Sequence, residues 1–174
     1  MIAGLAIIGM SILAACFYGI VHDMVTAHLC VEYFTIGHPP VFPTESPVLL
    51  ALGWGVIATW WVGLLLGVPL ALCSRLGAPP RRRARELVRP IAYLLAAMAV
   101  CSVIAGIVGN VLAATGVLEL RGHLATRVPA AQHIWFITDL WAHLAAYGAG
   151  LVGGIAVCVV TVLGRKAEAR RLCP

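Results

Sequence analysis

The fold of this chain is decided by residues 47–74, PVLLALGWGVIATWWVGLLLGVPLALCS, which contain no charged side chain. A helix that crosses a bilayer needs about 20 consecutive apolar residues, and this stretch exceeds that length. Three further uncharged stretches, at residues 1–21, 90–118 and 144–164, are long enough as well. We therefore predict an all-α fold, an integral membrane four-helix bundle forming a single domain over residues 1–174. Its predicted helices span about 2–36, 47–73, 90–118 and 131–164.

The composition of the whole chain favours the same fold class. Of the 174 residues, 61% are hydrophobic and 11% are charged, and the mean hydropathy is +0.98. A soluble domain carries about 25% charged and 45–50% apolar residues, so this mixture cannot both fill a core and cover a wetted surface. Transmembrane strands would alternate in hydrophobicity over about 10 residues, and the sequence shows no such alternation.

The basic residues are distributed unevenly along the chain. Six arginines lie between residues 75 and 89, and four further basic residues follow residue 164, whereas residues 22–46 contain no Lys or Arg. By the positive-inside rule, the arginine-rich loop and both the N- and C-termini are predicted to be cytoplasmic. The net charge of +5 is then a consequence of topology. We expect these arginines to meet anionic lipid headgroups of the bilayer and no nucleic acid.

The sequence argues against two other interpretations, a cleaved signal peptide and a thiol oxidoreductase. The first apolar stretch has no Lys or Arg before it, which a secretory signal peptide should have, so we expect a retained helix. The six cysteines contain no Cys-x-x-Cys pair, and only Cys30 is expected near the outer face. A quinone-coupled thiol oxidoreductase needs several outer cysteines, so this class is excluded.

Histidines and acids gather away from the arginines. All six histidines and five of the seven acids fall in the predicted outer half or outer loops. Two segments concentrate them, residues 22–33 and 132–143, and neither contains Gly or Pro. Both segments are therefore predicted to continue their helices beyond the hydrocarbon. Because these helices run antiparallel, His22 and His143 are expected at similar depth.

Helical spacing separates the polar residues into two layers. The lower layer contains His22, Asp23, Asp139 and His143. The upper layer contains His28, Glu32 and His133. Imidazole and carboxylate are usual ligands of Zn and Fe, so we predict that the lower layer holds a Zn or Fe ion. Ionisable residues near membrane depth are functional candidates by default, because burying them unpaired is costly.

Two more residues are predicted to have catalytic roles. Glu32 lies about 15 Å from His22 along a continuous helix, so it can join the lower layer only if the helix breaks between them. We predict that Glu32 is a general base or an additional ligand. Tyr147, one turn from His143, is expected to donate a proton or fix a substrate. His38 and His123 are expected to be exposed loop residues.

Three short stretches resemble a known group of proteins. They are YGIVHDMVT at 18–26, EYFTIGHP at 32–39 and WAH at 141–143. They resemble a family of uncharacterised bacterial four-helix inner-membrane proteins, and the resemblance runs through most of the chain. It implies a stand-alone, multi-pass protein of a bacterial inner (plasma) membrane. It implies no activity and no residue roles.

The functional hypothesis that follows is a small metal-dependent enzyme or redox protein that acts on a lipophilic substrate at the periplasmic face. Two alternatives stay open. In the first, the chain is a non-catalytic membrane subunit or assembly factor whose outer polar patch docks a membrane-protein partner or a second copy. In the second, His22 and His143 bind haem, which is disfavoured because an aspartate stands near each histidine. The polar residues could also be simply wetted at the end of the bundle.

Overall fold

The computed structural model of the chain describes residues 2–77 and 80–172, and within these ranges the regular structure is entirely helical. Four helical segments are long and apolar enough to cross a membrane. They are Ile2–Leu29, Pro47–Arg75, Ala84–Ala114 and Ala130–Leu172. The predicted all-helical architecture with four apolar helices is therefore confirmed. The insertion into a membrane and the cytoplasmic termini stay predictions.

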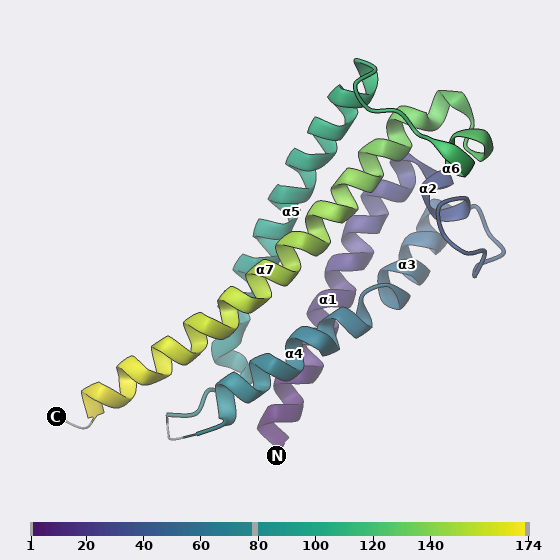
Figure 1. The fold of residues 1–174 in the computed structure, drawn as a ribbon. Coiled ribbons are helices and arrows are strands. Elements are labelled where there is room, and N and C mark those ends of the chain that lie inside the picture. The colour runs from purple at the N-terminus through teal and green to yellow at the C-terminus, as the bar shows by residue number, and fades with distance from the viewer. Residues whose placement is uncertain (1, 78–79, 173–174) are drawn as a thin grey trace.

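The helices form two antiparallel pairs (Figure 1). In the first pair, α1 (Ile2–Leu29) lies along α3 (Pro47–Ile57) and α4 (Trp60–Arg75). In the second, α5 (Ala84–Ala114) lies along α7 (His133–Leu172). The two pairs contact each other mainly between α4 and α7, and to a smaller extent between α1 and α5.

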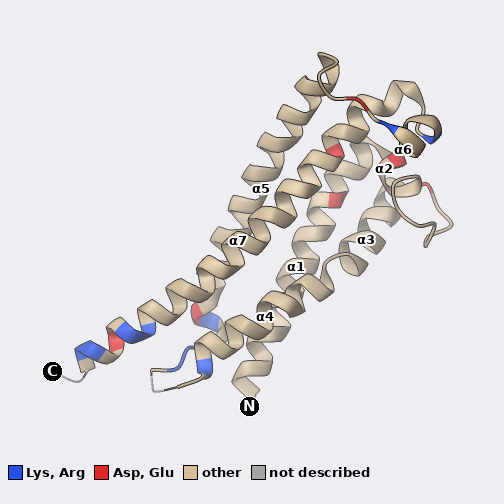
Figure 2. Cartoon of the chain, viewed as in Figure 1, with Lys and Arg blue, Asp and Glu red and all other residues tan. Residues whose placement is uncertain are grey.

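The two ends of the bundle differ in charge, as Figure 2 shows. Both chain ends and the α4–α5 connection lie at one end, where most Lys and Arg residues gather; we call it the arginine end. The opposite end carries the short helices α2 (Val31–Thr35) and α6 (Gly122–Arg127), together with most of the acids. We call it the histidine end, because α1 and α7 bring His22 and His143 together in that half.

Glycines allow the close helix approaches within the first pair. A Cβ atom on Gly19 would lie 2.5 Å from the carbonyl oxygen of Gly55, and one on Gly63 would lie 2.6 Å from Cα of Ile12. These spacings are too short for any side chain, so the backbones of α1 and of α3–α4 meet directly. Such contacts are the usual means of packing apolar helices that gain nothing from hydrophobic burial against lipid.

The predicted continuous first helix is wrong, because the chain breaks at Cys30. This residue has an extended backbone, with φ −150° and ψ 94°, and α2 begins immediately after it. The break turns the buried rings of Tyr33 and Phe34 across the bundle. A straight helix would carry both rings past the end of the bundle, so their burial favours the break.

The second span is also interrupted, at Ala58 and Thr59, and it ends at Arg75 instead of residue 73. The Thr59 hydroxyl donates to the carbonyl of Gly55, which is the acceptor that the Thr59 amide would use in a continuous helix. That amide instead bonds to Val56, one residue closer. Competition between a hydroxyl and the backbone for one carbonyl explains the interruption.

The third and fourth helices have different bounds from the predicted 90–118 and 131–164. Helix α5 begins before Pro90, because the Glu86 carboxylate accepts a hydrogen bond from the Arg83 amide at 3.0 Å and caps the first turn. It ends at Ala114, and Gly116, two residues later, adopts a positive φ of 73°. Helix α7 begins at His133, after a 3-10 turn at Ala130–Gln132, and continues through the basic tail to Leu172.

Candidate metal centre

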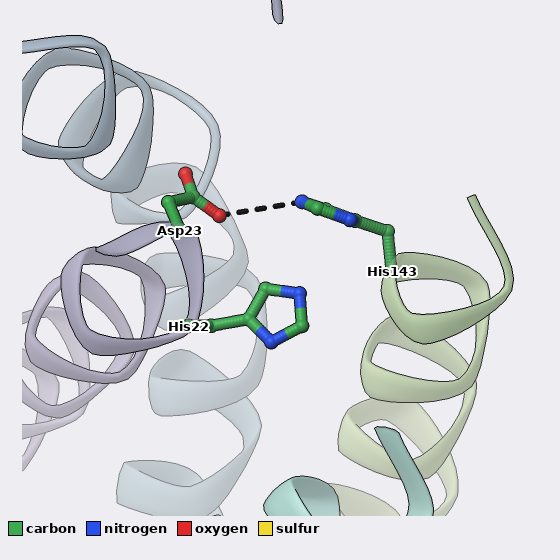
Figure 3. A group of neighbouring side chains, drawn as sticks. All are labelled: His22, Asp23 and His143. Carbon is green, nitrogen blue, oxygen red and sulfur yellow. Dashed lines mark hydrogen bonds and ion pairs between the residues drawn. The ribbon is translucent and has the colours of Figure 1, made fainter. Parts of the chain in front are cut away.

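Three side chains from two helices converge in the histidine half of the bundle: His22 and Asp23 from α1, and His143 from α7 (Figure 3). Each offers one potential ligand atom, and these atoms lie within 4.8 Å of one another. Asp23 and His143 are only 5% and 8% exposed. The expected contact between the first and last spans is therefore present, and it is buried.

The His143 ring is held so that its Nε2 atom faces Asp23. Its Nδ1 atom lies 2.8 Å from the backbone oxygen of Asp139, and a carbonyl oxygen can only accept, so Nδ1 carries a proton. The Nε2 atom lies 3.3 Å from Oδ1 of Asp23. In a neutral His143 ring, a proton on Nδ1 leaves the lone pair of Nε2 facing the carboxylate of Asp23. The two groups must then share either a proton or a cation.

The His22 ring is oriented in a similar way. Its Nδ1 atom lies 3.4 Å from the Ser102 hydroxyl of α5, and its buried Nε2 atom has no hydrogen-bond partner. Figure 3 shows Nε2 on the edge of the ring that faces Asp23 and His143. Both histidines therefore direct Nδ1 towards a neighbouring oxygen and Nε2 towards a common space. Metal-ligating histidines usually have this arrangement, because the second nitrogen fixes the ring.

The distance between His143 and Asp23 is compatible with a shared small metal ion as well as with a long hydrogen bond. A tetrahedral ion with nitrogen and oxygen ligands at about 2.0–2.1 Å keeps its ligand atoms about 3.3 Å apart. The Nε2–Oδ1 distance of 3.3 Å matches this value. A charge-assisted N–H···O bond is shorter, at about 2.7–2.9 Å. Two histidines and one carboxylate leave a coordination position open, as in catalytic zinc and non-haem iron sites.

Asp139, predicted as a fourth ligand, is not part of the three-residue cluster. Its backbone oxygen orients His143, while its carboxylate is completely buried and neither carboxylate oxygen has a hydrogen-bond partner. Asp139 is among the residues that line a separate groove between α1 and α5. The structure therefore brings together three of the four residues predicted to bind metal, and it gives Asp139 a different environment.

The two predicted catalytic residues have different positions. Glu32 lies beyond the helix break and accepts a hydrogen bond from the Cys30 thiol at 3.5 Å, and it does not line the cavity beside the cluster. Burial raises the pKa of Cys30 to about 12, so this thiol stays protonated and remains a donor at neutral pH. Tyr147 does line the cavity, and its hydroxyl donates to the carbonyl of Ala58 at 3.4 Å.

The predicted upper layer does not form a comparable cluster. The His28 ring bonds to the backbone oxygen of Met24 at 2.6 Å, and the His133 ring bonds to that of Val128 at 3.0 Å. Each histidine is thus hydrogen-bonded to its own local backbone. The break at Cys30 also removes the helical i, i+4 relation between His28 and Glu32.

His38 was expected to be exposed, and the structure corrects this. It is half-buried and lines the same cavity as the cluster, a space of about 130 Å³ that is large enough for several water molecules. Its ring contacts those of Tyr33, Phe34 and Trp54. Its Nδ1 atom lies 2.8 Å from the Tyr33 carbonyl, and burial lowers the pKa of His38 below its usual value.

One sequence feature could have indicated this position for His38. It follows Gly37, where a Cβ atom would lie 2.5 Å from the carbonyl oxygen of Tyr33, so the chain turns tightly back on α2 at a glycine. The glycine directly before His38 is therefore the residue in the sequence that is compatible with this tight turn.

Comparison of the chain with protein-family models, with curated proteins and with solved structures gave no match.

Proposed function

We propose that this chain is a multi-pass protein of a bacterial inner membrane that binds one Zn or Fe ion through His22, Asp23 and His143. In this proposal the site faces the periplasm, and the protein is a metal-dependent enzyme or redox protein acting on a lipophilic substrate. One observation carries the proposal: two imidazole Nε2 atoms and a carboxylate oxygen converge, while each Nδ1 atom is directed to another partner.

The cavity beside the cluster supports a catalytic site over a purely structural one. A structural zinc site is usually closed by four protein ligands, whereas three ligands leave a position for water or substrate. A bound ion would polarise the group that occupies this position. Two groups that can exchange protons line the same cavity, the imidazole of His38 and the hydroxyl of Tyr147. We assign the base role to His38, since Glu32 does not line the cavity.

The two alternatives fit the geometry less well. A docking patch must be accessible, but Asp23 and His143 are buried, and the rings of Tyr33 and Phe34 pack against His143 with centroids 4.5 and 5.8 Å away. Haem binding by two histidines places a porphyrin between their rings. The rings of His22 and His143 are in edge contact at 4.4 Å, which leaves no room for it.

Metal content is the direct test of this proposal. Protein purified without an affinity tag should contain close to one Zn or Fe per chain by elemental analysis. Either His22→Ala or His143→Ala should weaken binding about 10–100-fold or more. His28→Ala is the matched control, because this exposed histidine of the same helix bonds only to local backbone in the structure. A preparation that cannot be loaded with either metal would overturn the proposal.

The periplasmic orientation has an independent test. Reporter fusions at Pro43, Ala84, Leu124 and the C-terminus should read outside, inside, outside and inside, because the arginine end is predicted to be cytoplasmic. A cytoplasmic reading at Pro43 would contradict the orientation, and it would leave the metal site itself untouched.

A further inference from the structure

A second space, distinct from the central cavity, opens between α1 and α5, where the two helix pairs diverge. It is a groove of about 720 Å³, within the size range of small-molecule sites. Its rim is made of exposed apolar side chains such as Phe17, Val25 and Ile107, which are 66%, 59% and 60% exposed. If the helices span a bilayer, this rim faces lipid, so the groove is open to molecules dissolved in the membrane.

The floor of the groove is polar. Asp139 contributes a fully buried carboxylate with two unpartnered oxygens. Burial of a carboxylate without hydrogen bonds costs free energy of folding. Such groups are rare in native proteins, and each one requires an explanation. A ligand group that donates hydrogen bonds would remove this cost.

The remaining polar groups indicate which headgroup fits. Asn110 uses one amide N–H to donate to the Thr138 hydroxyl at 3.0 Å, which leaves its carbonyl oxygen as an acceptor and its second N–H as a donor. The described residues that line the groove include no Lys or Arg. An anionic headgroup would therefore meet a carboxylate and no compensating cation. A hydroxyl or amine headgroup would find acceptors.

The groove also borders the candidate metal centre. Tyr18, His22 and Leu95 line both the groove and the central cavity, so these side chains lie between the two spaces. The rings of Tyr18 and His22 are stacked, with centroids 5.7 Å apart. A headgroup held near Asp139 would lie against the outer side of a metal-binding residue.

We propose that the groove between α1 and α5 binds a membrane-dissolved amphiphile with a hydroxyl or amine headgroup and no phosphate or carboxylate. The apolar body lies between the two helices and the headgroup donates hydrogen bonds to Asp139. This inference rests on the proposed function and deepens it, because it names the substrate class and a lateral path from the lipid to the site.

The test uses the full-length protein in detergent and a long-chain alcohol with a photoreactive diazirine in its chain. Cross-links located by mass spectrometry should fall on the groove-lining parts of α1 and α5. Unlabelled long-chain alcohol or amine should compete, which also shows which of the two headgroups is preferred. A fatty acid of equal chain length should compete much less, because no Lys or Arg lines the groove to pair with its carboxylate.

Two pairs of variants sharpen this test. Ala99→Trp should fill the groove and reduce labelling severalfold, whereas Ala97→Trp is a matched control, since Ala97 is exposed on the same helix and does not line the groove. Asp139→Asn, compared with the original protein, replaces one carboxyl oxygen with an N–H donor at nearly constant shape. The fatty acid should then compete as well as the alcohol.

The possible outcomes distinguish the groove proposal from the metal-site proposal. Labelling that spreads over all lipid-facing helices, or that Ala99→Trp leaves unchanged, would overturn the inference. So would equal competition by alcohol and fatty acid in the original protein. If the groove is labelled as expected but no metal binds, the proposed function fails while the groove stands as a binding site. If metal binds and the groove is not labelled, the groove proposal fails and the proposed function stands.

Discussion

The arginine end and the histidine end of the bundle both bury charged or ionisable side chains, but they satisfy them differently. At the arginine end, the guanidinium of Arg165 is 8% exposed and donates to the carbonyls of Cys73, Leu76 and Pro80. Two of these carbonyls lie in the last turn of α4 or just after it, where the helix leaves acceptors without internal partners. The buried charge of Arg165 therefore ties α7 to the end of α4.

The histidine half leaves several of its buried polar atoms unpaired. Among the described residues, the buried side-chain atoms without a hydrogen-bond partner are Tyr18 Oη, His22 Nε2, Gln132 Oε1 and both carboxylate oxygens of Asp139 in this half, and only Ser74 Oγ at the arginine end. Burial is costly at either end. The two ends therefore differ in how polar groups are satisfied: one end uses them to hold helices together, while the other leaves several of them without a protein partner.

The largest expected effect on stability is at Arg165. Arg165→Met leaves three carbonyls without their charged donor, so the free energy of unfolding should fall by about 2–4 kcal/mol. Denaturation in detergent, followed by circular dichroism, measures this change. Arg170→Met, at an exposed position of the same helix, should change stability by less than about 0.5 kcal/mol. Equal effects of the two substitutions would remove the structural role of the arginine end.

A smaller effect of opposite sign is expected at Asp139. Asp139→Leu removes an unpartnered buried carboxyl group, so the free energy of unfolding should rise by about 1–2 kcal/mol. The same denaturation measurement applies. Asp23→Leu is the matched variant, and it should destabilise the protein because Asp23 is paired with His143. A loss of stability in Asp139→Leu as large as in Arg165→Met would erase the contrast between the two ends.

The smallest effect is expected at an ion pair of the arginine end. Nη2 of Arg82 lies 2.8 Å from Oε2 of Glu168, whose side chain is 42% exposed. Glu168→Gln should lower the free energy of unfolding by less than about 1 kcal/mol, since solvent screens such a pair. High salt should remove the difference from the original protein. A larger, salt-independent loss would show that this ion pair, and not Arg165, holds the arginine end together.

The candidate site was only partly predictable from the sequence, and particular residues show why. His22, Asp23 and His143 could be grouped because residues at known helical spacing, at matching depths of antiparallel helices, must lie at similar heights. Asp139 lies about one turn of α7 from His143 and on nearly the same face, so spacing alone could not exclude its carboxylate from the cluster. The position of this carboxylate outside the cluster depends on how far α7 is rotated about its own axis. The spacing of residues in the sequence does not give that rotation.

The environment of His38 was mispredicted for another reason. It was expected to be an exposed loop residue, and no Gly or Pro in residues 22–33 indicates the break at Cys30 that redirects the chain before it. The break at Cys30 buries Tyr33 and Phe34 against Phe136 and His143, which come from the other end of the sequence. A local pattern cannot contain the energy of a contact made more than a hundred residues away.

By itself, the sequence determined the four apolar helices and the separation of arginines from histidines and acids. These properties follow from the transfer of single side chains between water and an apolar phase, so they can be summed residue by residue. Only the tertiary structure decided which polar atoms meet, where α1 breaks and which carboxylate stays without a partner. Those outcomes depend on the rotation and packing of whole helices, because each extra residue turns a side chain by about 100° around its axis.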